Sequence, residues 1–498
     1  MLKKLVQRAL FLLCPFLFFY TFPGVAQNFD PQLVEVYNHF LDLRLREEPE
    51  ILHSKEFASD ENKALQVYIK NLGQVLDLLL VKDEDKFNTY QKNERLHYQM
   101  LEKLNGDNPF VAYLKIELKL HHGLLKLRYG DRITGAFSLI QAFRLINNYE
   151  KTYTDHPYTL KTTGLLNVII SLFPDQLNWL LNIMQVHPDI TKGVSYLKEL
   201  SQSTSIFRRE GSLLYALSLS YYTHNAGEAL VLLKNKSDEF DNSLLYKYLY
   251  GLISIKNRNN LSALQHFDSC LNFGRDYLQV PLINYYRAES YLKELNFNRA
   301  AYLYKVYLEK PDGDEYIKDS YYKLYNLAVL FHIPDQKINA YKNGVLTEGS
   351  LNTASDNYAY TRIVNNYHPD ETLFKSRVLF DGGYYKRSLE ILESQGPETF
   401  SGIEEVSEYL YRYARNYQQL DETSVAVEYF NKVIAVEGAE SYYFWGNSLL
   451  HLGNICIVTG EPEKAREFYK EALRYKGEEY RNSIRMEAKM GLKKMEDN

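Results

Sequence analysis

Apolar residues between Leu449 and Leu473, LLHLGNICIVTGEPEKAREFYKEAL, recur every three or four positions, which is the spacing of one face of an α-helix. The first such face contains Leu449, Leu452, Gly453 and Cys456, and a neighbouring helix can approach closely where glycine has no side chain. Gly460 ends this helix and Pro462 begins a second one, whose apolar face contains Ala465, Phe468, Tyr469 and Ala472. The pattern predicts an antiparallel hairpin of two helices, neither of which can bury its apolar stripe alone.

The pattern of the second helix recurs upstream at a nearly constant spacing. Copies begin with a small residue at Ala426, Ser388, Ala300, Ala263, Ala229, Gly193 and Ala136. Five of the spacings, from Gly193 to Ala300 and from Ser388 to Ala465, are 34 to 39 residues, and a further hairpin between Ala300 and Ser388 has Leu324, Leu327, Ala328 and Phe331 on its first helix. Small residues also recur within the first helices, at Gly251, Ala288 and Ala414, where helices that cross closely require them. The chain is therefore predicted to be an array of helical hairpins.

These hairpins resemble the tetratricopeptide repeat. Its signature is a helix with a Leu-Gly pair and an aromatic residue soon after, a turn, and a second helix with Ala, an aromatic residue and Ala at helical spacing, with a period of about 34 residues. The resemblance implies an all-α fold, a right-handed α-solenoid in which first helices line a concave groove that binds extended peptides or partner helices. We expect the array over residues 211–475 and a capping helix with a polar outer face over residues 476–498.

The N-terminal part is helical but less regular. Helices are predicted over residues 33–45, 61–80, 85–104, 108–127 and 132–146, so we interpret residues 27–150 as an irregular start of the solenoid and residues 151–210 as diverged helical pairs. The block from Thr162 to Met184 does not fit the repeat, but it resembles the eukaryotic tetratricopeptide-repeat 39 proteins at Gly164, Asn167, Ser171 and Pro174. Residues 351–370, rich in Asn, Tyr and Ser, are predicted to be an insertion that forms either a loop or a distorted pair.

The first 26 residues have the pattern of a secretory signal peptide. A basic start is followed by an apolar run from Ala9 to Phe22 and by small residues at Gly24 and Ala26. A permanent membrane anchor would need about 20 apolar residues, so we expect cleavage after Ala26 and a periplasmic or secreted protein without a membrane span. Cys270 and Cys456 occupy apolar helical positions and are expected to be buried fillers, not a disulfide pair.

Net charge and the absence of known motifs argue against several classes of function. The net charge is -5, and without a basic face a nucleic-acid partner has little electrostatic support. The chain has no phosphate-binding loop, nucleophile elbow, His-Glu-x-x-His or Cys-x-x-Cys motif, so we expect no enzyme activity, no cofactor and no metal. His121 and His122 are adjacent, but neighbouring residues point about 100° apart on a helix, which does not suit one shared ion.

Tyrosine supplies the candidate binding residues, because the chain contains 44 of them. Four lie at equivalent positions of four first helices, namely Tyr248, Tyr285, Tyr325 and Tyr411. An aromatic ladder of this kind could hold an extended ligand, since tyrosine offers a large contact area with a polar tip; the alternative is packing between repeats. One helical turn further on, Glu289, Arg415 and Asn454 are predicted to be flanking polar contacts.

Two binding functions follow from these patterns. The first is a non-enzymatic protein-protein interaction scaffold in the bacterial cell envelope, which binds a partner protein or peptide in the concave groove. The alternative is a secreted protein that captures a glycan or peptide with the tyrosine ladder. A hydrolase within the irregular N-terminal part is a third class, for which no catalytic set of residues is visible. The sequence leaves the partner and the oligomeric state open.

Overall fold

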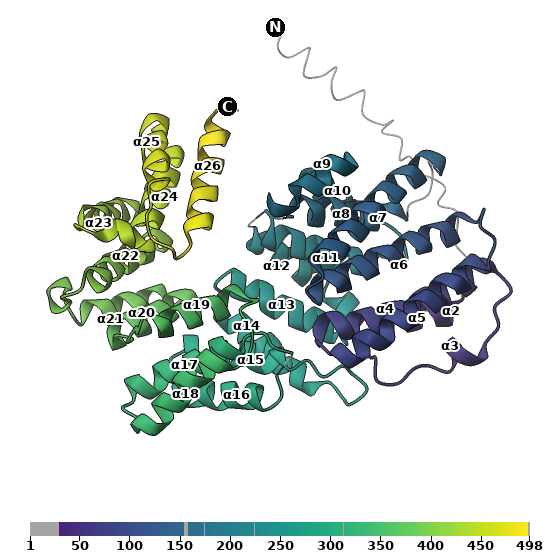
Figure 1. The fold of residues 1–498 in the computed structure, drawn as a ribbon, viewed down its shortest axis with the longest axis horizontal. Coiled ribbons are helices and arrows are strands. Elements are labelled where there is room, and N and C mark those ends of the chain that lie inside the picture. Colours follow the sequence, from purple (N-terminus) through teal and green to yellow (C-terminus); the bar gives the residue numbers. More distant parts are fainter. Residues whose placement is uncertain (1–28, 154–157, 174, 224, 312, 497–498) are drawn as a thin grey trace, which may run out of the picture. The chain divides into compact units, whose positions relative to one another are not determined.

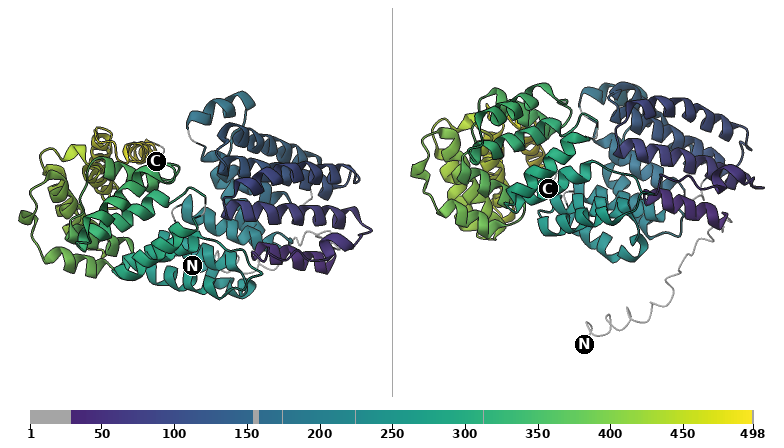
Figure 2. Two further views of the ribbon diagram at one scale, coloured as in Figure 1. Left: turned by 60° about the horizontal axis from the view of Figure 1, so that its bottom comes forward. Right: turned by 90° about the horizontal axis from the view of Figure 1, so that it is seen from below.

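The computed structural model describes residues 29–153, 158–173, 175–223, 225–311 and 313–496, and these residues form helices, turns and loops (Figure 1). The two further views show the same helices from other sides (Figure 2). The predicted signal peptide, residues 1–26, lies outside the described residues, as does Pro174. Within the described part, no helix combines the length and the apolar character that a membrane span needs.

The chain folds into two units. Unit 1 comprises the chain up to Phe40, Glu48–Gln74 and Tyr90–Gly211, whereas unit 2 comprises Leu41–Glu47, Val75–Thr89 and the chain from Ser212 onward. Two short segments of the N-terminal region thus belong to the second unit, although they are far from it in sequence.

Unit 1 is built from the irregular helices that the sequence predicts. Its elements, some of which extend into unit 2, are α2 (Pro31–Leu41), α3 (Ile51–Ser54), α4 (Asp60–Leu80), α5 (Glu84–Glu102), α6 (Pro109–Arg128), α7 (Arg132–Thr152), α8 (Thr159–Ser171), η1 (Asp175–Leu177), α9 (Asn178–Met184), α10 (Ile190–Gln202) and α11 (Arg208–Tyr221). The pairs α6–α7 and α8–α10 pack together. At the second crossing, an added Cβ on Gly193 would lie 2.8 Å from the carbonyl oxygen of Gly164, so the two backbones meet directly.

Unit 2 contains the regular array. Its further elements are α12 (Ala226–Asn235), η2 (Ser237–Phe240), α13 (Leu244–Lys256), α14 (Asn260–Ser269), η3 (Cys270–Asn272), α15 (Leu282–Lys293), α16 (Phe297–Glu309), α17 (Ile317–Leu330), α18 (Asp335–Thr347), α19 (Ala354–Val364), α20 (Glu371–Asp381), α21 (Tyr385–Glu393), η4 (Pro397–Thr399), α22 (Ile403–Gln419), α23 (Thr423–Ala435), η5 (Ala439–Ser441), α24 (Tyr443–Val458), α25 (Pro462–Ala472) and α26 (Arg481–Glu496). Hairpins form from α13–α14, α15–α16, α17–α18, α20–α21, α22–α23 and α24–α25. The predicted insertion contains the single helix α19, which packs on α17 and α18.

Small residues allow the two helices of a hairpin to approach, as the sequence predicts. An added Cβ on Gly251 would lie 2.6 Å from the Phe267 ring, and one on Gly453 would lie 2.6 Å from the Tyr469 ring. Ala414 is fully buried at the corresponding crossing of α22 and α23. Phe267 and Tyr469 on the second helices therefore fill the space that Gly251 and Gly453 leave on the first helices.

Two hairpins of unit 2 that are far apart in sequence also contact each other. The turn between α13 and α14 meets the turn between α20 and α21, where the Asn260 backbone N–H donates to the Gly382 carbonyl oxygen at 3.3 Å. Gly383 has φ +84°, and an added Cβ would lie 2.0 Å from the Arg258 carbonyl oxygen. Glycine is required there both for its backbone conformation and for the close approach.

Replacing Gly383 with alanine is expected to destabilise unit 2 more than the same change at Gly460. Gly460 has φ +78° and no atom within 4 Å of an added Cβ, so Gly460→Ala measures the cost of the left-handed conformation alone, about 1–2 kcal/mol. Gly383→Ala adds a clash with backbone, about 1–3 kcal/mol more. Urea unfolding followed by Trp445 fluorescence, in a Trp179→Phe background, compares the two variants. Equal losses would show that the contact between the turns adds nothing.

Candidate interaction surface

The four predicted ladder tyrosines lie in the helix packing of unit 2. The exposed fraction is 4% for Tyr248 and Tyr411 and 3% for Tyr285 and Tyr325. A ligand that stacks on an aromatic ring needs an exposed ring face, which these residues do not offer. Their placement favours the packing interpretation of the pattern.

The contacts of these tyrosines explain why their rings are buried. Three of the four tyrosines bridge successive first helices. The Tyr285 hydroxyl on α15 donates to Asp319 Oδ2 on α17 at 2.8 Å, and burial raises the pKa of that carboxyl to about 6. The Tyr248 ring on α13 lies 6.2 Å from the Tyr286 ring on α15. Periodicity thus identified equivalent positions, but the side chains there join neighbouring hairpins.

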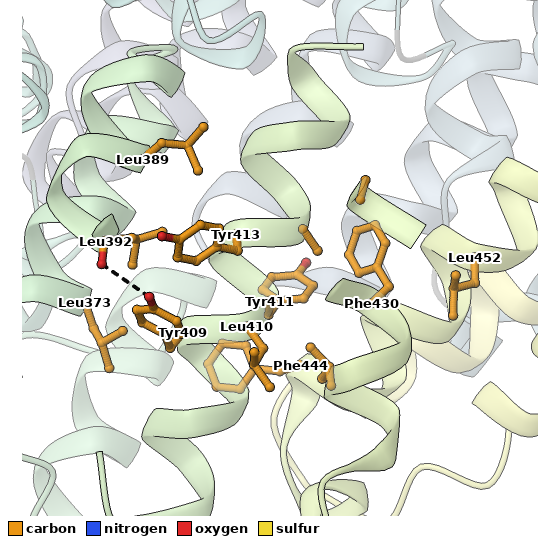
Figure 3. Packing of buried hydrophobic residues seen from close by; sticks show 13 residues of the cluster. Leu373, Leu389, Leu392, Tyr409, Leu410, Tyr411, Tyr413, Phe430, Phe444 and Leu452 are labelled. Carbon is orange, nitrogen blue, oxygen red and sulfur yellow. Dashed lines mark hydrogen bonds between the residues drawn. The ribbon is translucent and has the colours of Figure 1, made fainter. Parts of the chain in front are cut away.

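Tyr411 shows the same arrangement in the hydrophobic core around α22. Figure 3 shows its ring lying near Phe430 and Phe444, with centroid separations of 6.1 and 5.5 Å. Nearby, the Tyr409 hydroxyl donates to the Leu392 carbonyl oxygen at 3.3 Å. These aromatic residues connect three consecutive hairpins through one core.

The three predicted polar contacts are more accessible than the tyrosines, but two of them accept hydrogen bonds from second helices. Glu289 is half-buried, accepts a hydrogen bond from Tyr304 and pairs with Lys323 Nζ at 3.3 Å. Asn454 is exposed, and its Oδ1 accepts a hydrogen bond from the Tyr469 hydroxyl at 2.7 Å. Arg415, the third predicted contact, is half-buried and lies beside the Phe380 ring.

Arg415 belongs to what we call the arginine surface, which consists of Arg258, Arg415, Phe380 and His451. The guanidinium carbons of Arg258 and Arg415 lie 4.7 and 5.1 Å from the Phe380 ring centroid. Arg415 donates from Nη1 to the Tyr411 hydroxyl at 3.0 Å, and its buried Nε has no hydrogen-bond partner. Among the described residues, neither arginine forms an ion pair. Two half-buried cations therefore share one aromatic ring without a carboxylate.

The charge of this surface affects His451 on α24. Burial lowers the pKa of His451 well below its ordinary value, and the cations of Arg415 and Arg258 lower it further. The imidazole is consequently neutral at physiological pH and adds no positive charge. Helical spacing predicts Arg415 as a contact residue but gives no signal for Arg258, because Arg258 lies in the turn after α13, outside the helical pattern.

A second group of charged residues, the buried ion cluster, lies in unit 1 and consists of Lys161, Glu117, Glu210, Tyr68 and Thr162. Lys161 Nζ on α8 pairs with Glu117 on α6 and, at 3.1 Å, with Glu210 on α11, and it donates to the Tyr68 hydroxyl at 2.5 Å. The Lys161 and Glu117 side chains are 1% and 0% exposed. Thr162 and Tyr68 both donate to Glu117. This closed network has all its strong donors satisfied internally, which is typical of a structural role.

The remaining residues singled out in the sequence have separate partners. His121 Nδ1 lies 2.6 Å from Asn71 Oδ1, whereas His122 Nδ1 lies 2.8 Å from Glu94 Oε2, so the two rings face different groups as predicted. The described residues contain no group of three or more His, Cys, Asp or Glu side chains arranged to hold a metal ion. Cys270 and Cys456 are both buried and free, which confirms their prediction as fillers.

Family comparisons match two parts of the chain. The family described as Iml2/Tetratricopeptide repeat protein 39 matches residues 159–312, and the family described as Tetratricopeptide repeat matches residues 407–439 and 446–479. The first match contains the block that resembles the repeat-39 proteins in sequence, and the second contains the hairpins α22–α23 and α24–α25. No curated protein matches the chain.

Solved structures similar to the chain include a human IFIT1 dimer with m7Gppp-AAAA and yeast Tom70. The IFIT1 chain is 14% identical, with 90% of this chain and 95% of that chain covered and a TM-score of 0.33. Tom70 is 12% identical, with coverages of 88% and 97% and a TM-score of 0.24. The family matches and the regular hairpins of unit 2 show that the chain contains tetratricopeptide repeats.

Proposed function

We propose that this protein is a non-enzymatic scaffold of the bacterial cell envelope that holds an acidic segment of a partner protein against the arginine surface. Binding of protein partners is the usual role of tetratricopeptide repeats, since each hairpin adds surface to a continuous array. The proposed location rests on the leader-like pattern of the first 26 residues. The tyrosine ladder does not enter the proposal because its rings are buried.

The unpaired guanidinium groups of the arginine surface carry this proposal. A half-buried cation without a counter-ion is unfavourable, and a carboxylate from a partner would relieve that cost through charge-assisted hydrogen bonds. Arginine presents its donors in a planar fork that matches a carboxylate, and both forks lie within cation–π distance of the Phe380 ring. The two arginines come from different hairpins, α13–α14 and α22–α23, so a bound segment would contact the array at two places.

Replacing Arg258 and Arg415 together with glutamine is expected to weaken partner binding by at least about tenfold, because each lost charge-assisted hydrogen bond contributes roughly 1.5–3 kcal/mol. Quantitative affinity capture from native envelope extract, followed by titration of the purified partner, measures the change. Binding to the parent chain should also weaken as salt is added.

The matched control replaces Arg387 and Arg485 with glutamine, since both are exposed arginines of unit 2 and the change in net charge is the same. The control should bind like the parent. If both double variants recover and bind the same partner equally well, the arginine surface is not the binding site.

A further inference from the structure

A hollow of about 670 Å³ lies in unit 2, away from the arginine surface. Six segments form its wall: Arg46, the residues from Val81 to Lys86 at the turn into α5, Leu244 on α13, the residues from Cys270 to Phe273, the residues from Leu278 to Asn284, and the end of α16 with Lys310 and Pro311. The first and the last of these segments are more than two hundred residues apart in sequence. A hollow formed from such distant parts of the chain exists only in the folded unit.

Specific contacts hold this wall in place. The Leu278 backbone N–H donates to the Leu43 carbonyl oxygen at 2.8 Å, and the Arg46 N–H donates to the Asp276 carbonyl oxygen at 3.1 Å. Arg44 adds an ion pair to the Asp276 carboxylate at 2.9 Å. The segment around Arg46 is thereby tied to the loop that carries Leu278, so the hollow is largely pre-formed.

Part of the hollow is lined by apolar side chains. Leu271 is 54% exposed, and Phe273 and Val306 are half-buried, so their side chains are accessible to a ligand. The thiol of Cys270 also lines it, and burial raises the pKa of that thiol to about 12. These residues offer an apolar ligand group an environment from which water is easily displaced.

Charged side chains of both signs surround this apolar lining. Lys82 and Lys86 line the hollow while their ammonium groups pair with Asp314 and Asp77, at 2.8 and 2.7 Å. Arg46 and Lys310 are exposed, and among the described residues neither forms an ion pair. Two carboxylates, of Asp83 and Glu309, also line the hollow. Because Lys82 and Lys86 are already paired, Arg46 and Lys310 are the lining cations available to an anionic ligand.

We infer that this hollow binds an amphipathic anion, whose apolar body contacts Leu271, Phe273 and Val306 and whose carboxylate or phosphate head group pairs with Arg46 and Lys310. Its volume lies within the range of small-molecule sites, roughly 300–1,000 Å³, which combine apolar lining with a few polar groups that fix orientation. The site shares no residue with the arginine surface, so it is a binding function separate from the proposed scaffold role.

Fluorescence of 1-anilinonaphthalene-8-sulfonate, itself an amphipathic anion, tests this inference on the purified chain. The dye should bind saturably, and decanoate and decyl phosphate should displace it, which compares the two head groups. Decanol, which has the same apolar body without the charge, should displace it at least about tenfold less effectively. The Arg46→Gln/Lys310→Gln variant should bind the displacing anions about tenfold more weakly than the parent.

Two controls make the outcome specific to this hollow. The Lys305→Gln/Lys337→Gln variant removes the same charge from exposed positions of α16 and α18 and should bind decanoate like the parent. Bound decanoate should also slow thiol labelling of Cys270 several-fold without affecting Cys456, which lies on α24. Equal binding by the two double variants, or labelling of Cys270 that decanoate does not slow, would overturn the inference.

Discussion

Replacing Lys161 with methionine is expected to lower the free energy of unfolding by about 3–5 kcal/mol. The substitution removes the buried cation that pairs with both Glu117 and Glu210, and the buried carboxylate of Glu117 then has no counter-ion. Removing one partner of a buried ion pair typically has a cost of this size, because the remaining charge is neither solvated nor paired. Urea unfolding followed by circular dichroism measures the loss, and hydrogen exchange of the α6 amides assigns it to unit 1.

A second substitution separates the effect of the unpaired charge from that of lost packing. Glu117→Gln combined with Lys161→Met keeps the shapes of both side chains and removes both charges, so the double variant should regain much of the stability that Lys161→Met loses. Trp445 emission should stay unchanged in both variants, since that residue belongs to unit 2. A loss below about 1 kcal/mol for Lys161→Met would mean that the buried ion cluster is not essential to unit 1.

Acidification from pH 7 to pH 5 is expected to lower the stability of unit 1 by about 2 kcal/mol for each of His97 and His121. The pKa of both imidazoles is lowered to about 4, chiefly by burial and in part by Lys70 and Lys161, while nearby glutamates act in the opposite direction. In the unfolded chain both imidazoles take up a proton below the ordinary histidine pKa of about 6.5, whereas in the folded chain they stay neutral until the pH approaches 4. The free energy of unfolding of unit 1 is therefore unaffected by these two histidines above pH 6.5 and decreases progressively as the pH falls toward 4.

Unfolding of unit 1 in urea at pH 7, 6 and 5, followed by hydrogen exchange, tests this dependence. The His97→Gln/His121→Asn variant should show a flatter response over this interval, whatever its stability at pH 7. The control, His39→Gln/His53→Gln, changes two histidines that pair with Glu35 and Glu48 at more accessible positions and should retain the parent slope. An unchanged slope in the first variant would show that other groups determine the acid sensitivity.

The sequence predicted the regular hairpins because their packing is local. Gly453 and Tyr469 are separated by one turn, and the 2.6 Å approach of an added Cβ to that ring explains why one small and one aromatic residue recur together. The predicted pairing of α24 with α25 and the role of α26 as a terminal helix depend on the same short-range pattern. Repeat periodicity therefore specified the helices of unit 2 well.

Contacts between distant segments were not predictable in this way. No periodic signal shows that residues 41–47 and 75–89 belong to unit 2, or that Lys161 meets Glu117, because each depends on the tertiary arrangement of diverged helices. The tyrosine ladder illustrates the same limit. Helical spacing placed Tyr285 correctly on its helix, but its burial results from tertiary packing, in which its ring meets Tyr304 on α16 and its hydroxyl donates to Asp319 on α17. Of the predicted contacts, Arg415 alone lies on the arginine surface.

The contact between the α13–α14 and α20–α21 turns has a consequence for how this chain can evolve and unfold. In a simple solenoid each repeat contacts its neighbours, so repeats can be duplicated or deleted and can unfold stepwise. Here the hydrogen bond from Asn260 to Gly382 fixes the number of helices between the two turns. Inserting a hairpin between them would displace Gly383 from Arg258, so repeat number in this stretch is constrained, and the hairpins from α13 to α21 should melt as one cooperative block.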